Sequence, residues 1–110
     1  MDLSEQYRER MVEEQIAARG ITDGRVLRAF KIVPRHLFIP EVDPAAAYAD
    51  SPLSIGSGQT ISQPFIVAKT CELADLNGTE KVLEIGTGSG YAAAVVSLMA
   101  EQVDTLGLLE

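Results

Sequence analysis

The chain of 110 residues has no tryptophan, one cysteine and one histidine. A single thiol excludes an internal disulfide, and without cysteine or histidine neighbours at ligand spacing it predicts no metal site. We expect Cys71 to be a small buried residue on a helix, as free cysteines usually are. His36 lies beside Arg35 in a proline-bounded turn, which favours a structural or surface role over that of a general base.

Positive charge is also scarce. Nine basic residues against 16 acidic ones give a formal charge of -7, which repels a phosphate backbone and argues against nucleic acid as a partner. No hydrophobic run approaches the roughly 18 residues of a membrane span. The charged start of the chain lacks the apolar core of a secretory signal. We therefore expect a cytoplasmic protein with no membrane partner.

Hydrophobic residues make up 46% of the chain and charged residues 23%, which is typical of a globular protein with a packed core. The length allows one domain at most. We expect a single partial domain, in which residues 1–55 form a helical N-terminal extension and loop. Residues 56–110 are expected to carry a second, polar loop and the first β-α-β unit.

Two helices are predicted in the N-terminal part. The first runs from Ser4, as N-cap, to Arg19, with Gly20 directly after its end. The second is capped by Thr22 and stops near Val33, because a proline follows and disfavours helical geometry in the residue before it. Residues 34–40 are read as a short turn or a single helical turn.

Residues 41–64 contain three prolines and two glycines with no sustained period, which predicts a long irregular connection. Pro64 can open a helix reaching Leu76, and its apolar residues lie on more than one face, so we expect it to be buried. A short buried strand at Lys81–Ile85, a helix ending near Glu101 and a second strand at Val103–Leu109 follow. This order predicts an α/β fold that opens a parallel sheet behind a helical extension.

The glycine-rich stretch VLEIGTGSGY joins the first of these strands to its helix. Gly86, Gly88 and Gly90 let the backbone approach a ligand closely, and Glu84 at the strand end needs a donor or a cation. The ammonium group of S-adenosylmethionine would satisfy this carboxylate. Two alternatives stay open: a nicotinamide dinucleotide, and a tight βα turn beside a half-exposed acid with no ligand at all.

Three segments in one order, VLRAFKIVPRHLFIP, GSGQTISQPFIVAKTCEL and VLEIGTGSGY, resemble protein-L-isoaspartate O-methyltransferases from about Met11 to Val103. GQTISQP is far more specific to that family than the glycine turn. The resemblance implies a Rossmann-like S-adenosylmethionine-dependent methyltransferase fold, incomplete in this chain. It implies methyl transfer to the carboxylate of isoaspartyl residues in damaged proteins or peptides, which is a protein-repair reaction.

The same resemblance assigns the polar loop to the site. Gln59, Thr60 and Ile61 are expected to line it beside the cofactor, and Ser62 is expected at the catalytic position. Because a carboxylate is already ionised at pH 7, Ser62 fits an orienting, hydrogen-bonding role better than that of a nucleophile. The alternative is that the Ser62 hydroxyl caps the helix that begins near Pro64.

The glycine turn and the acid before it are expected to bind the cofactor. By resemblance, Glu84, Gly86, Gly88 and Gly90 match the family's motif for the methionine end of S-adenosylmethionine.

The chain also departs from the family pattern. The family's sheet has about seven strands, whereas this sequence reaches only the second, and Gly107 stands where the family's ribose-binding acid is expected. These departures predict a truncated chain of doubtful activity alone, which self-associates through its open sheet edge or is poorly soluble. The rival hypotheses are a truncated, non-catalytic paralogue acting as an interaction module, a nicotinamide oxidoreductase, and a methyltransferase with another acceptor.

Overall fold

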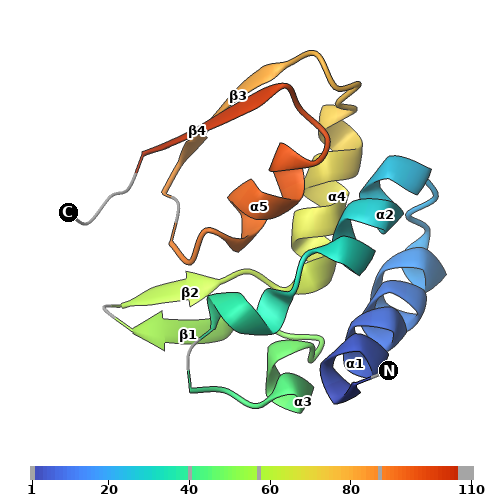
Figure 1. The fold of residues 1–110 in the computed structure, drawn as a ribbon, viewed down its shortest axis with the longest axis vertical. Coiled ribbons are helices and arrows are strands. Elements are labelled where there is room, and N and C mark those ends of the chain that lie inside the picture. The colour runs from blue at the N-terminus through green and yellow to red at the C-terminus, as the bar shows by residue number, and fades with distance from the viewer. Residues whose placement is uncertain (1, 40, 57, 87, 107–110) are drawn as a thin grey trace.

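The computed structural model describes residues 2–39, 41–56, 58–86 and 88–106. Helices make up the N-terminal part, a β-hairpin and a longer helix follow, and a β-α-β unit closes the described chain (Figure 1). The β-α-β unit confirms the predicted α/β class. None of the described helices is long and apolar enough to cross a membrane.

The first helical segment is continuous but changes its winding along its length. Helix α1 (Leu3–Arg10) passes into a π-helical turn (Met11–Ile16) and then a 3-10 turn (Ala17–Arg19). Its N-cap is Asp2, whose side chain accepts a hydrogen bond from the Glu5 amide, so the prediction of Ser4 as the cap is wrong. Both residue types cap well, and Asp2 stands at the position whose oxygen reaches N3.

Gly20 ends this segment in the left-handed region with φ of 99°, as predicted. Helix α2 (Gly24–Ile32) follows, and its cap is Asp23, not Thr22 as predicted. The Asp23 carboxylate accepts from the Arg25 amide and pairs with the Arg25 guanidinium. The helix ends at Val33 as expected, and a 3-10 turn (Arg35–Phe38) forms the predicted short turn.

The connection predicted as irregular contains regular structure, so that prediction is wrong in part. Helix α3 (Pro44–Ala47) is a single turn capped by Asp43. Strands β1 (Leu53–Gly56) and β2 (Gln59–Ile61) form an antiparallel hairpin with an irregular register near its tip. Strands this short carry too few residues for a visible alternation, which is why the sequence pattern did not reveal them.

Helix α4 (Pro64–Ala74) begins at the predicted proline and ends slightly before Leu76. Its buried residues are Pro64, Val67, Ala68 and Cys71. The prediction that this helix is buried is wrong in part, because Ile66 is 50% exposed and Leu73 is 73% exposed.

Strands β3 (Lys81–Ile85) and β4 (Gln102–Leu106) pair in parallel, joined through helix α5 (Tyr91–Ser97). This confirms the predicted β-α-β unit. Helix α5 is shorter than expected, and residues 107–109 of the predicted second strand lie outside the described residues. The expected burial of the first strand is wrong: only the face carrying Val82 and Glu84 is half-buried, while Leu83 and Ile85 on the other face are exposed.

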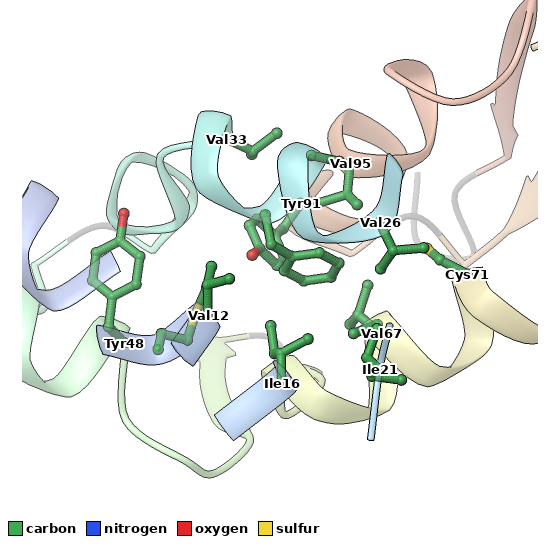
Figure 2. Packing of buried hydrophobic residues seen from close by; sticks show 14 of the residues in the cluster. Val12, Ile16, Ile21, Val26, Val33, Tyr48, Val67, Cys71, Tyr91 and Val95 are labelled. Atoms are coloured by element: carbon green, nitrogen blue, oxygen red, sulfur yellow. The ribbon is translucent and has the colours of Figure 1, made fainter. Parts of the chain in front are cut away.

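One hydrophobic core lies between the N-terminal helices, α4 and α5. Figure 2 shows Tyr91 of α5 at its centre, surrounded by Val12, Val26, Val67 and Val95. Phe30 and Phe38 meet the Tyr91 ring edge to face, with centroids 6.1 and 5.8 Å away. Because both ends of the sequence contribute to one core, the chain packs as a single unit. The predicted division of this unit into an extension at residues 1–55 and a second part at residues 56–110 stays a prediction.

Cys71 is buried on α4, as predicted, and this burial raises the pKa of its thiol to about 11. At pH 8 roughly one thiol in a thousand is then ionised, and the thiolate is the reactive form. We expect the native chain to react with a disulfide reagent such as DTNB far more slowly than the chain unfolded in urea. Equal rates, followed by absorbance, would contradict the burial of this thiol.

Candidate functional site

The hairpin carries the polar loop residues toward the end of the β3–β4 sheet. Ile61 faces Leu53 across the hairpin and is buried, whereas its neighbours Thr60 and Ser62 are exposed. This alternation is the ordinary consequence of a strand with one side against the core. The backbone then turns at Gln63 into α4, so Ser62 is held between two regular elements.

Ser62 is anchored by its backbone and not by its side chain. Its carbonyl oxygen accepts a hydrogen bond from Arg35 Nη2 at 3.0 Å, while its hydroxyl makes no hydrogen bond to the residues described. Helix α4 has Gln63 as its N-cap, with no side-chain cap bond. The capping role considered for Ser62 is therefore wrong, and its hydroxyl is available to a ligand.

The glycine turn follows β3 directly. Gly86, Gly88 and Gly90 have φ of 81°, 56° and 87°, a left-handed region in which a side chain is strained. The Gly86 amide donates to the Leu106 carbonyl at 2.7 Å and so extends the parallel ladder. A Cβ at Gly88 would lie 3.9 Å from the Thr60 carbonyl oxygen. The turn and the hairpin are therefore in close approach.

A cleft of about 160 Å³ lies between these two segments. Its lining contains predicted residues from both sides, namely Thr60, Ile61, Ser62, Glu84, Gly86 and Gly88. Ser89 and Tyr91 also line the cleft beside the glycine turn, and among the described residues Glu84 is the one charged side chain of the lining. A ligand in this cleft would meet a carboxylate, the hydroxyl-bearing residues Thr60, Ser62, Ser89 and Tyr91, and glycine backbone.

Glu84 occupies an unusual position for a carboxylate. It lies at the end of β3 with Oε1 buried and without a hydrogen-bond partner among the described residues. Burial raises the pKa of this carboxyl group above its ordinary value. An unpaired buried acceptor is costly, so its partner is expected to be a donor that arrives with a ligand.

A larger apolar groove of about 370 Å³ opens beside the cleft, between α4, α5 and β3. Ser62, Val67 and Glu84 border both spaces. The cleft alone is smaller than typical small-molecule sites, which hold roughly 300–1,000 Å³. It fits one end of a ligand rather than the whole of one.

Two predicted site residues lie outside the lining of this cleft. Gln59 is half-buried on β2, and Gly90 faces the Phe38 ring. His36 is half-buried with Nδ1 3.0 Å from the Tyr48 hydroxyl, in agreement with a structural role. Arg35, which is fully buried behind Ser62, was not among the residues predicted for the site. Its position between hydrophobic residues and a proline was the one available signal.

A parallel strand pair with a glycine turn at the carboxyl end of its first strand is a feature of a Rossmann-like α/β fold, and in this chain an acid lies two residues before that turn. The model of the protein-L-isoaspartate(D-aspartate) O-methyltransferase family matches residues 5–107. The chain belongs to this family, and the described elements are part of its Rossmann-like methyltransferase fold.

Individual relatives agree with this assignment. A protein-L-isoaspartate O-methyltransferase 2 of Shewanella sediminis is 57% identical over 110 residues, covering 97% of this chain and 45% of its own length. A relative from Rhodopseudomonas palustris, named protein-L-isoaspartate O-methyltransferase 1, is 60% identical over 99 residues and is covered over 40% of its length. The chain thus spans less than half of these relatives.

Solved structures show the same fold. A protein-L-isoaspartate O-methyltransferase superposes with a TM-score of 0.77 at 33% identity, covering 89% of this chain and 32% of that one. A Plasmodium falciparum protein described as a member of the same class gives 0.70 at 26% identity, covering 91% and 47%. That second structure holds S-adenosyl-L-homocysteine.

Proposed function

We propose that this protein methylates the carboxylate of isoaspartyl residues in damaged proteins or peptides, with S-adenosylmethionine as methyl donor. The observation that supports this proposal most directly is the shared cleft, in which Ser62 and Thr60 of the polar loop face Glu84, Gly86 and Gly88. Family membership supports the same reaction.

The reaction requires no strong acid or base from the protein. Bound S-adenosylmethionine supplies a methyl group on a positively charged sulfur. An oxygen lone pair of the acceptor carboxylate forms the new C–O bond as the C–S bond breaks, and the electron pair of that bond stays on sulfur. Because the acceptor is already ionised at pH 7, the protein needs only to align the two reactants and exclude water.

The residues of the cleft suit these two tasks. The free hydroxyl of Ser62 can donate to the acceptor carboxylate and orient it. Glu84 can accept from the ammonium group at the methionine end of the cofactor, which would satisfy its buried Oε1. Gly86 and Gly88 leave room for the cofactor to approach the backbone.

Ligand titration followed by NMR tests the proposal. S-adenosylhomocysteine is expected to shift the amide signals of Gly86 and Gly88, with weak affinity because the cleft holds only one end of the ligand. Methyl transfer by these 110 residues is expected to be slow, because the chain spans less than half the length of its relatives, and to occur on an isoaspartyl peptide and not on the same peptide with ordinary aspartate. The absence of signal changes at millimolar ligand, or transfer to ordinary aspartate, would contradict the proposal.

The rival hypotheses give different results in the same experiment. A nicotinamide oxidoreductase would show the signal changes with NADH in place of S-adenosylhomocysteine. A non-catalytic interaction module would bind neither ligand. A methyltransferase with another acceptor would bind S-adenosylhomocysteine but leave the isoaspartyl peptide unmodified.

We further propose that copies of this chain associate through the open side of the β3–β4 sheet. Among the described strands, β3 pairs only with β4, so its other edge offers unpaired backbone groups. Leu83, Ile85 and Leu106 lie on the same exposed face of the sheet, at 63%, 65% and 54% exposure. In an otherwise acidic chain, the same face also carries Lys81 and Asp104, the register partner of Leu83, so its two charges are of opposite sign. A cytoplasmic location also stays a prediction.

Sedimentation velocity over a range of protein concentrations tests the association. We expect the weight-average sedimentation coefficient to rise with concentration, and we expect Leu83→Lys to reduce that rise because a charge on the strand discourages pairing. Leu3→Lys, on the exposed side of α1, is the matched control. A monomer at every concentration, or equal effects of both variants, would contradict this interface.

A further inference from the structure

Among the described residues, Arg35 is the one charged side chain that is fully buried, with 0% exposure. It lies in the 3-10 turn between α2 and α3, and the proposed reaction assigns it no role. A guanidinium removed from water loses much of its solvation, so its contacts must compensate. Burial lowers the pKa of Arg35, and the groups that counteract this are the phenol groups of Tyr91 and Tyr48, not a carboxylate.

The contacts of Arg35 join three separate segments. Arg35 Nε donates to the carbonyl of Ala47, at the end of α3, at 2.6 Å. Nη2 donates to the carbonyl of Ser62 at 3.0 Å. The guanidinium carbon also lies 4.8 Å from the centroid of the Tyr91 ring, at a distance typical of a cation–π contact.

Two of these partners belong to opposite walls of the cleft. Ser62 stands on the hairpin side, and Tyr91 begins α5 directly after the glycine turn. The planar guanidinium is a rigid fork, so a carbonyl bonded to one of its nitrogens and a ring in contact with its central carbon are held relative to each other. Arg35 therefore connects the two walls from the protein interior.

We propose that Arg35 is a positioning residue that sets the separation between Ser62 and the glycine turn. The inference rests on the proposed methyl transfer, in which donor and acceptor must lie in line across this cleft. Misplacement by about 1 Å can cost a reaction roughly 100-fold. A lysine at this position keeps the charge but lacks the planar fork, so it leaves one of the two carbonyls or the ring contact unsupported.

Amide hydrogen exchange in Arg35→Lys is the first test, with Arg28→Lys as the matched control because Arg28 is exposed on α2. We expect exchange at residues 59–63 to become at least about tenfold faster, while exchange in β3 stays within about twofold. Arg28→Lys is expected to change neither segment. Unchanged exchange at residues 59–63, or an equal rise in β3, would overturn the proposal.

Methyl-transfer kinetics give the second test. Arg35→Lys is expected to lower kcat about tenfold or more, with KM for S-adenosylmethionine within about threefold, since the cofactor contacts at Glu84 and the glycine turn persist. A rise in KM with unchanged kcat would contradict the positioning role. If the unsubstituted chain transfers no methyl group, the proposed reaction fails while the exchange experiment still decides the role of Arg35.

The unsubstituted chain provides a check in case Arg35→Lys does not fold. Its NMR spectrum is expected to show a slowly exchanging Nε proton on Arg35, with nuclear Overhauser contacts from the guanidinium protons to Tyr91 and Ser62. The absence of those contacts would overturn the proposal without any variant.

Discussion

Replacement of Phe30 by alanine is expected to lower the free energy of unfolding by about 3–5 kcal/mol. Phe30 is fully buried on α2, and its ring meets Tyr91 edge to face at 6.1 Å. The variant loses this transfer energy and the aromatic contact, and it leaves a cavity that the surrounding helices fill only in part. Since a whole domain is stable by roughly 5–15 kcal/mol, we expect a large fall in the midpoint of urea unfolding followed by circular dichroism.

Leu37→Ala is the control for this substitution. Leu37 is 71% exposed, so its truncation is expected to change the free energy of unfolding by less than about 0.5 kcal/mol. Similar losses in the two variants would contradict the placement of the core between the N-terminal helices and α5. A loss of solubility in Phe30→Ala alone would agree with the expected exposure of that core.

Replacement of Glu84 by glutamine is expected to weaken binding of S-adenosylhomocysteine roughly 10- to 100-fold. A hydrogen bond to a charged group contributes about 1.5–3 kcal/mol, and about 1.4 kcal/mol corresponds to a factor of ten. The amide keeps the shape of the side chain but loses the charge that faces the ligand's ammonium group. The NMR titration used for the unsubstituted chain measures the change. Equal affinities would remove Glu84 from the cofactor site.

Glu84→Gln is expected to weaken ligand binding but not to lower the stability of the ligand-free protein. Burial raises the pKa of Glu84 in the folded chain, so the folded state binds its proton more tightly than the unfolded state. Stability therefore falls as pH rises from the unfolded pKa of about 4.5 through the folded pKa, and the penalty is fully present above it. At pH 7 Glu84→Gln should be at least as stable as the unsubstituted chain.

Glu80 is the matched control for that pH dependence. Its carboxylate accepts from the backbone amides of Asn77 and Gly78, and these bonds lower its pKa. Its contribution to stability is present above the unfolded pKa and is lost as pH falls through the folded pKa. Glu80→Gln is thus expected to lower stability at pH 7 without affecting ligand binding. Urea unfolding at pH 4 and pH 7 separates the two carboxylates.

The sequence allowed some features to be predicted because they depend on local backbone chemistry. Gly20 ends the first helical segment because a left-handed residue without Cβ is unstrained there, and Pro64 opens α4 because its missing amide is not needed at a helix start. The caps at Asp2 and Asp23 were missed because a competing polar residue lay within two positions. Choosing between such neighbours requires the helix start itself.

The residues of the candidate site also include some that the sequence predicted and some that only the structure placed. Glycine spacing and the acid two residues earlier marked the turn after β3, since these requirements come from the backbone of that turn alone. The resemblance placed Ser62 and Thr60 opposite it, and the structure brings both residues to one cleft with Glu84. Gln59 lies outside its lining at the start of β2, next to the tip of the hairpin, and Gly90 lies outside it because it faces Phe38.

The sequence by itself determined the order of the longer helices and of the β-α-β unit, the family and the residue types at the turn, since each is set by neighbours along the chain. Only the tertiary structure decided that Arg35 is buried between Ala47, Ser62 and Tyr91, and that one face of β3 stays exposed. Burial depends on which segments distant in sequence meet in space. No local pattern contains that information.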